Sequence, residues 1–156
     1  MILSLLHDRR SLAEVASLKK AIEDLYGLYG VQVHDRGYFH VPFKEQRLDA
    51  SRLLRHMAAA SAPEMCLWVV DEELFYPGKG QVFGCSTGNY AIISRFKMDQ
   101  AVLAKEAIHE VGHLLGLDHC QEHCVMNLSK SREEAGNKSS SLCKSCSARL
   151  RALADI

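Results

Sequence analysis

The sequence carries no net charge. Its nineteen basic residues are balanced by nineteen acidic ones, so no bulk positive field favours nucleic acid or an anionic membrane. Aromatic residues make up only 7% of the chain and are scarce near its cysteine-rich end, although bases often stack on such side chains. We therefore expect neither a nucleic-acid partner nor a membrane partner.

Long apolar runs are also missing. The stretch from Met1 to Leu6 is apolar but too short for a transmembrane helix or a signal-peptide core, and it lacks a basic stretch before it and a small-residue cleavage site after it. We interpret it as a buried strand and expect a soluble, cytoplasmic, monomeric protein. At 156 residues, 47% of them hydrophobic, a single domain over 1–156 can bury its own core.

Internal repeats and inter-domain linkers are absent as well, and the predicted elements alternate between strands and helices. Strands are expected at 1–6, 31–41, 65–70, 81–87 and 90–94. Helices are expected from a capping box at Ser11 and Glu14 to Gly30, from Asp49 to Pro63, from about Met98 to Gly116, and from about Cys143 to Leu153. The polar segment 127–141 is expected to be a loop or a short helix. This order predicts an α/β fold with a mixed sheet.

The segment from His109 to His119, HEVGHLLGLDH, has the residue types of a zinc site. On a helix, His109 and His113 leave the same face one turn apart, so both imidazoles can bind one Zn²⁺ at about 2.0–2.1 Å. Glu110 can accept a proton from a zinc-activated water. Gly116 permits the left-handed turn that ends the helix, after which His119 supplies a third ligand. Three protein ligands leave one position for water, as catalytic zinc requires.

The alternative for this segment is an ordinary amphipathic helix that matches HExxH by chance. The full pattern fixes three histidines, one glutamate and one glycine within eleven positions, after a plausible helical approach. A pattern of this length favours a metal site over a chance match.

Four of the six cysteines lie in the last quarter of the chain. They form a C-x3-C pair and a C-x2-C pair: Cys120, Cys124, Cys143 and Cys146. Four thiolates can close a tetrahedron around Zn²⁺ and leave no position for water, so this second site would be structural. Alternatives are two disulfides, a zinc-ribbon nucleic-acid module, or His123 in place of one cysteine. Cys66 and Cys85 fall in predicted strands and are expected to be buried thiols.

The two motifs together resemble a known family. His109 to His119 is similar to the zinc signature of the metzincins, and Met126 matches the methionine of their Met-turn. With the cysteine pairs, the segment resembles the archaemetzincins, a family of small metzincin-like proteases. Four residues usually separate the first two cysteines in that family, whereas three do here. The resemblance implies a compact metzincin-like domain with a mixed twisted sheet and a long active-site helix in an N-terminal part, 1–116. A small zinc-stabilised C-terminal part, 117–156, would follow.

The resemblance also implies a zinc metallopeptidase with two Zn²⁺ ions, one catalytic and one structural. Its substrate would be a peptide or protein, hydrolysed by a zinc-activated water with Glu110 as general base. In metzincins an extended substrate pairs with an edge strand, which Phe83, Gly84 and Cys85 resemble. A plain edge strand with a glycine bulge is the alternative for these three residues. For the whole chain, the alternative is a catalytically silent zinc-binding interaction module of the same fold.

Overall fold

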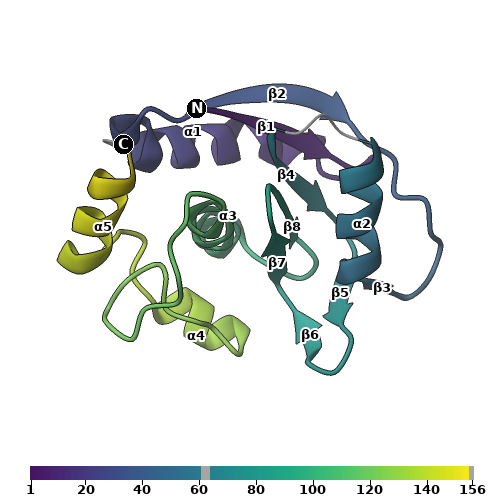
Figure 1. Ribbon diagram of the computed structural model, residues 1–156. Coiled ribbons are helices and arrows are strands. Elements are labelled where there is room, and N and C mark those ends of the chain that lie inside the picture. Colours follow the sequence, from purple (N-terminus) through teal and green to yellow (C-terminus); the bar gives the residue numbers. More distant parts are fainter. Residues whose placement is uncertain (61–63, 155–156) are drawn as a thin grey trace.

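The computed structural model describes residues 1–60 and 64–154. Its centre is a five-stranded sheet in the order β2-β1-β4-β8-β7 (Figure 1). The strands are β1 (Ile2–His7), β2 (Gln32–Tyr38), β4 (Met65–Val70), β7 (Gly84–Thr87) and β8 (Tyr90–Ser94). The first four strands in that order are parallel, and β7 is added antiparallel to β8 at the edge.

Helices cover both faces of this sheet. On one face lie α1 (Val15–Tyr26) and α3 (Gln100–Leu114), and on the other lies α2 (Ala50–Ala60) (Figure 1). Side chains of β4 alternate between the two cores. Leu67 and Val69 pack with α1 and α3, whereas Trp68 and Val70 pack with α2. Burial on both faces explains why β4 is a continuous apolar run, as expected for a central strand.

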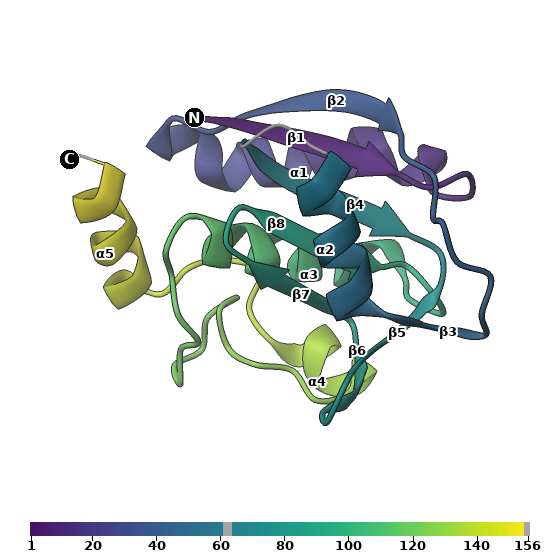
Figure 2. The same cartoon turned by 45° about the vertical axis from the view of Figure 1, so that its right-hand side comes forward.

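A second, three-stranded sheet lies beside the edge of the first. It contains β3 (Arg47–Asp49), β5 (Glu73–Tyr76) and β6 (Gly80–Val82), and the chain passes from β6 directly into β7 (Figure 2). The single strand expected at 81–87 is therefore wrong. It is divided at Phe83, because its first half pairs with β5 and its second half with β8.

The helix ends follow local chemistry with one exception. Carboxylates of Asp49 and Asp99 accept backbone N–H groups in the first turns of α2 and α3. The capping box at Ser11 is wrong. A short 3₁₀ turn, Leu12–Glu14, comes first, and the buried Ser11 hydroxyl has no hydrogen-bond partner among the described residues. Gly30, at φ 86°, follows a 3₁₀ turn (Gly27–Tyr29) after α1. Pro63 lies outside the described residues.

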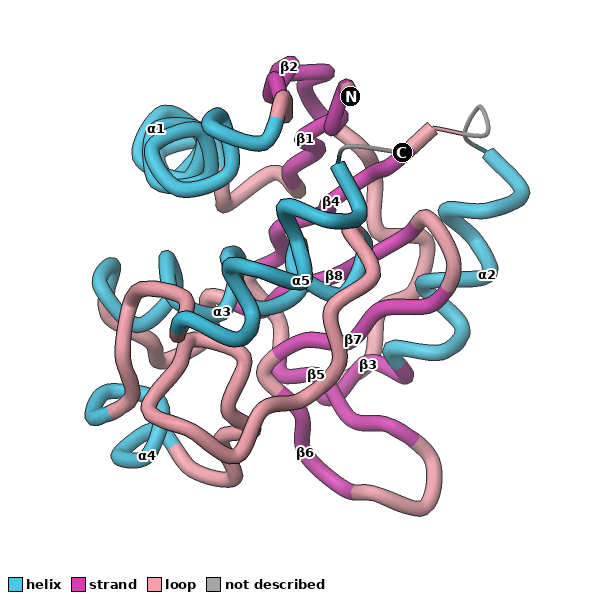
Figure 3. The backbone as a smooth tube through the Cα atoms, turned by 60° about the vertical axis from the view of Figure 1, so that its left-hand side comes forward, coloured by secondary structure: helices cyan, strands magenta, loops and turns pink. Residues whose placement is uncertain are grey.

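The chain after α3 is mostly irregular (Figure 3). It contains the short α4 (Arg132–Asn137) and ends with α5 (Lys144–Ala154). Buried residues of this part join the core formed by α1 and α3: Leu117, Cys124, Val125, Met126, Cys146 and Leu150. The expected α/β fold with a mixed sheet is confirmed. Within residues 1–60 and 64–154, none of the helices combines the length and the apolar composition that a membrane span requires.

Candidate metal centre

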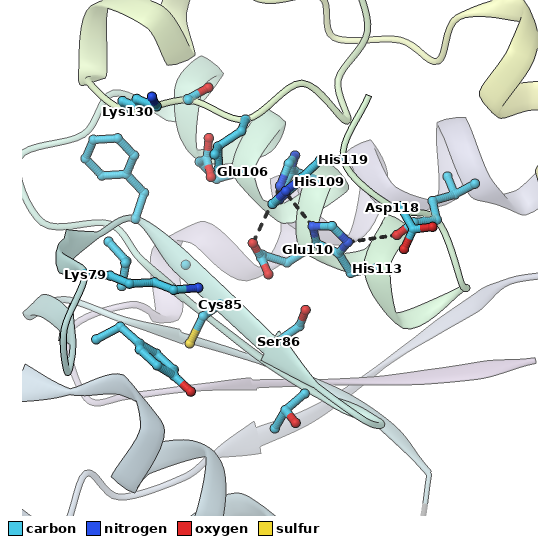
Figure 4. Close-up of a pocket in the computed structure, with 18 of the residues that line it drawn as sticks. Lys79, Cys85, Ser86, Glu106, His109, Glu110, His113, Asp118, His119 and Lys130 are labelled. Atoms are coloured by element: carbon cyan, nitrogen blue, oxygen red, sulfur yellow. Dashed lines mark hydrogen bonds and ion pairs between the residues drawn. The ribbon is translucent and has the colours of Figure 1, made fainter. Parts of the chain in front are cut away.

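The last turns of α3 and the chain after it bring three imidazoles together (Figure 4). His109 and His113 project from the same face of the helix, and their Nε2 atoms are 3.2 Å apart. Gly116, at φ 103°, turns the chain back towards the helix. As a result, the centre of the His119 ring lies 5.4 Å from the centre of the His109 ring and 4.8 Å from that of the His113 ring. Ligand atoms of all three histidines lie within 4.8 Å of one another.

Backbone carbonyls orient the two helical imidazoles. Nδ1 of His109 lies 2.9 Å from the Val125 carbonyl oxygen, and Nδ1 of His113 lies 2.8 Å from that of Leu117. Each Nδ1–H therefore donates to a carbonyl, which leaves the Nε2 lone pair facing the other rings. Two nitrogen ligands of a tetrahedral zinc are about 3.3 Å apart at Zn–N distances near 2.0–2.1 Å. The donor atoms and their separation fit Zn²⁺.

The surroundings also favour the neutral form of two of these rings, His109 and His119. Burial lowers the pKa of His109 to about 3, and Lys138 acts in the same direction. Burial is likewise the main cause that lowers the pKa of His119, followed by the neighbouring His113. Because only a neutral imidazole offers its lone pair to a metal, this environment favours metal binding over protonation.

Glu110 lies beside the imidazoles with its side chain almost fully buried. One carboxylate oxygen is 3.9 Å from Nε2 of His109, and the other has no hydrogen-bond partner among the described residues. Burial raises the pKa of Glu110 to about 8 and the nearby Glu106 adds to this, whereas a hydrogen bond from Ser86 opposes it. A buried acid with a raised pKa next to a cluster of ligands is a candidate general base.

Strand β7 crosses directly over Glu110 because residue 84 is glycine. A Cβ there would lie 2.9 Å from the Ile92 carbonyl oxygen and 3.1 Å from Cγ of Glu110. Glycine is therefore required at position 84 because the backbone of β7 lies so close to α3 and β8. Phe83 and Cys85, its neighbours, also line the hollow in front of the imidazoles. The Cys85 thiol, expected to be buried, is only half-buried, because β7 is an edge strand, and its partial burial raises its pKa to about 12.

Met126 packs beneath α3 at Gly112. A Cβ on Gly112 would overlap with Sδ of Met126 and would lie 2.9 Å from the hydroxyl oxygen of Tyr26. That hydroxyl donates a hydrogen bond of 2.7 Å to the Ile108 carbonyl. Sequence reasoning missed Gly112 and Tyr26, although a glycine inside a predicted helix often marks a packing requirement.

A buried ion pair flanks the centre and was also missed. Nζ of Lys138 lies 3.2 Å from Oε1 of Glu106, and both side chains are only 6% exposed. The Lys138 ammonium also donates to the Asn127 carbonyl at 3.2 Å. Glu106 is one helical turn before Glu110, which is a usable signal, whereas Lys138 lies in a polar segment with nothing to distinguish it.

The four C-terminal cysteines form a second cluster. Their sulfur atoms lie within 4.8 Å of one another, and the sulfurs of Cys120 and Cys143 are 3.7 Å apart. Two sulfur ligands of a tetrahedral zinc are about 3.8 Å apart at a Zn–S distance near 2.3 Å. Backbone N–H groups point at the sulfurs, and the one from Cys146 lowers the pKa of Cys143 to about 7. His123 is exposed and lies outside this cluster, and Cys66 is buried elsewhere.

The imidazoles open into a cleft of about 800 Å³. Its walls are the edge strand β7, the end of α3, the turn 116–119 and the loop 128–130. Figure 4 shows the Ser86 side chain of β7 pointing towards Glu110, whereas the Cys85 sulfur points away from it, towards the core beside α2. An edge strand next to a reactive centre offers unpaired backbone groups to an extended ligand.

Comparison with known proteins identifies a matching peptidase family and several related sequences. The model for peptidase family M54 matches residues 64–152. Archaemetzincins of Archaeoglobus fulgidus and Aeropyrum pernix are 34% and 38% identical to this chain, over 56% and 53% of its length. The archaemetzincin of Nanoarchaeum equitans is 31% identical over 67% of the chain. These matches span 61%, 50% and 62% of the relatives' own lengths, less than two thirds in each case.

Solved structures share the fold along the whole chain. The crystal structure of an archaemetzincin from Methanopyrus kandleri has a TM-score of 0.85 at 26% identity, covering 100% of this chain and 96% of that one. An archaemetzincin from Archaeoglobus fulgidus, complexed with malonate, has a TM-score of 0.84 at 24% identity, with 96% and 99% covered. The expected metzincin-like fold is therefore confirmed.

Proposed function

Because this chain belongs to peptidase family M54, we propose that it is a zinc-dependent metallopeptidase whose catalytic ligands are His109, His113 and His119. The observation that carries the proposal is the convergence of three imidazoles on one point that opens into a cleft beside an edge strand. A structural zinc would be closed by a fourth protein ligand, and none is present in this cluster among residues 1–60 and 64–154.

The proposed reaction is hydrolysis of a peptide bond. Zinc, when bound, supplies a Lewis acid that polarises the scissile carbonyl and acidifies water. Glu110 takes the proton of the attacking water and passes it to the nitrogen of the leaving amine. The carbonyls of Val125 and Leu117 hold the His109 and His113 rings in the required orientation. Phe83, Gly84 and Cys85 would contribute backbone groups that align an extended peptide.

We further propose that Cys120, Cys124, Cys143 and Cys146 hold a second, structural Zn²⁺, so that the chain binds two zinc ions. The backbone N–H groups directed at the sulfurs of Cys120, Cys124 and Cys143 favour their thiolate forms. This zinc would stabilise the part after Gly116, which has little regular structure, against the part formed by 1–116.

The test is hydrolysis of a peptide library by the zinc-loaded protein and its Glu110→Gln variant. We expect the variant to keep both zinc ions and to lose at least a hundredfold in kcat/KM, because the amide cannot accept the proton. Glu133→Gln, an exposed change of the same chemistry on α4, is the control and should hydrolyse like the parent. If Glu110→Gln hydrolysed peptides at the parent's rate, Glu110 would not be the base.

The competing function is a catalytically silent zinc-binding module. Glu110 argues against it, because burying a carboxyl with an unpartnered oxygen costs stability and serves no purpose in a purely structural site. A protein that bound two zinc ions but cleaved no member of the library would support the silent module.

A further inference from the structure

The acidic side chains that line the cleft have partners or a proposed role, whereas its lysines have no ion-pair partner among the described residues. Three acids line it, and each already has a role or a partner. Glu110 is the proposed base, Glu106 is paired with Lys138 at 3.2 Å, and Asp118 is paired with Arg149 at 3.0 Å. The cleft also contains two lysines, Lys79 and Lys130.

Neither lysine has an anionic partner for its ammonium group within the part of the chain that the structure describes. The Lys79 ammonium lies 5.4 Å from the centre of the Tyr76 ring and forms no ion pair with any described residue. Lys130 uses its backbone N–H, not its ammonium, to bind the Glu134 carboxylate at 2.7 Å. Both residues are exposed and lie in loops, so neither side chain is needed for the fold.

The two lysines lie at the same end of the cleft. Figure 4 shows Lys79 and Lys130 on one side of the imidazoles and Asp118 on the other. Arg132 strengthens the basic end, since its guanidinium lies 5.8 Å from the centre of the Phe83 ring. In a chain without net charge, this end is a local positive field.

The direction of β7 relates this basic end to a bound peptide. Strand β7 runs from Gly84 to Thr87, and Lys79 precedes it on the β5–β6 hairpin. Antiparallel pairing is slightly more stable per residue than parallel pairing, so we expect a peptide to run from Thr87 towards Gly84. The residues on the C-terminal side of the scissile bond then lie at the basic end.

We propose that Lys79 and Lys130 bind a carboxylate on the C-terminal side of the scissile bond, so that the enzyme prefers acidic peptides. This inference rests on the proposed function and names its substrate class. The carboxylate has two possible sources, an Asp or Glu side chain or the free C-terminus of a short peptide. Both present the same group to the two ammonium ions.

The test uses one fluorogenic peptide in four forms, with Glu or Gln after the scissile bond and with a free or amidated C-terminus. The zinc-loaded protein should hydrolyse at least one carboxylate form about tenfold faster, in kcat/KM, than the uncharged form, as expected for two partly exposed ion pairs. Comparing the two singly charged forms identifies the source. The preference should fall in 1 M salt, where the Debye length is about 3 Å.

Two double variants assign the preference to these residues. Lys79→Gln/Lys130→Gln should reduce the tenfold ratio to about twofold, and Lys79→Glu/Lys130→Glu should favour a Lys-containing peptide instead. The matched control, Lys20→Gln/Lys44→Gln, changes net charge equally but lies outside the cleft, and it should keep the parent's ratio. Equal hydrolysis of all four peptides by the parent, or an unchanged ratio in the first variant, would overturn this inference. Failure to cleave any peptide would instead count against the proposed peptidase function.

Discussion

Gly112 illustrates how one missing side chain positions the centre. It lies between the two helical histidines, and Met126 and Tyr26 occupy the space where a Cβ would be. Alanine would gain up to about 1 kcal/mol in helix propensity over glycine. Against this, overpacking a filled core costs about 1–3 kcal/mol, and Met126 is fully buried, so its sulfur cannot move freely.

For Gly112→Ala we therefore expect a net loss of about 1 kcal/mol in the free energy of unfolding. We also expect weaker zinc binding at the imidazoles, because α3 must shift away from Met126. Denaturant unfolding and competition with a chelator measure the two effects. Gly136→Ala is the control, since its Cβ would meet no atom closer than 4.0 Å. If the two variants changed the free energy of unfolding and the zinc affinity equally, the contact with Met126 would not contribute to either.

Glu110 should make the metal-free protein sensitive to pH. Burial raises its pKa from 4.5 to about 8, so the folded state keeps a proton that the unfolded state has released. The carboxyl therefore costs no stability below pH 4.5 and costs progressively more as the pH rises to 8. Glutamine does not ionise, so Glu110→Gln should melt increasingly above the parent from pH 5 to pH 8. Zinc should reduce that difference, because a cation beside the carboxyl favours its charged form. Melting temperatures that differ by the same amount at every pH would contradict this account.

At the scale of elements, the pair formed by Glu106 and Lys138 joins α3 to the chain after α4. Lys138→Met leaves Glu106 buried without a partner, and breaking a buried pair in this way costs about 3–5 kcal/mol. The double variant Glu106→Gln/Lys138→Met should recover part of that loss. Lys105→Met, which removes only an exposed bond to the Gly136 carbonyl, should cost less than about 1 kcal/mol. Urea unfolding of the three variants tests this, and a Lys138→Met variant as stable as Lys105→Met would refute the role of the pair.

The sequence predicts the elements whose signals are local. Strand β4 is a continuous apolar run, and α3 has a carboxylate cap at Asp99 and a glycine stop at Gly116, so both occur where expected. The break at Phe83 arises because the chain leaves its hairpin with β5 there and pairs with β8 from Gly84 onwards, and the sequence pattern does not show this change of partner. The Ser11 capping box fails because the tertiary structure buries the hydroxyl before a 3₁₀ turn.

At the scale of the whole molecule, the residues of the candidate centre were predictable because five of them share one eleven-residue pattern. The lysines of the cleft were not, because they come from separate loops whose proximity depends on the folded chain. The same holds for Lys138, whose burial follows from the path of the irregular part after α3.

Removing the metals should loosen this irregular part before the sheet. Among residues 117–154 only α4 and α5 are regular, and the rest depends on the two clusters and on the core beneath α3. We expect chelation to accelerate amide exchange first at 117–131 and 139–147, while β1 and β4 stay protected. Hydrogen–deuterium exchange before and after chelation measures this. Uniform acceleration across the sheet would indicate that the metals stabilise the whole domain instead.

The most direct test of the metal centre is anomalous diffraction from crystals of the purified protein, collected on both sides of the zinc absorption edge. We predict two peaks. One should lie about 2.0–2.1 Å from Nε2 of His109 and His113 and from a ring nitrogen of His119, and the other about 2.3 Å from the four cysteine sulfurs. A single peak at the cysteines, with none among the imidazoles after zinc has been added, would contradict the assignment of a catalytic zinc.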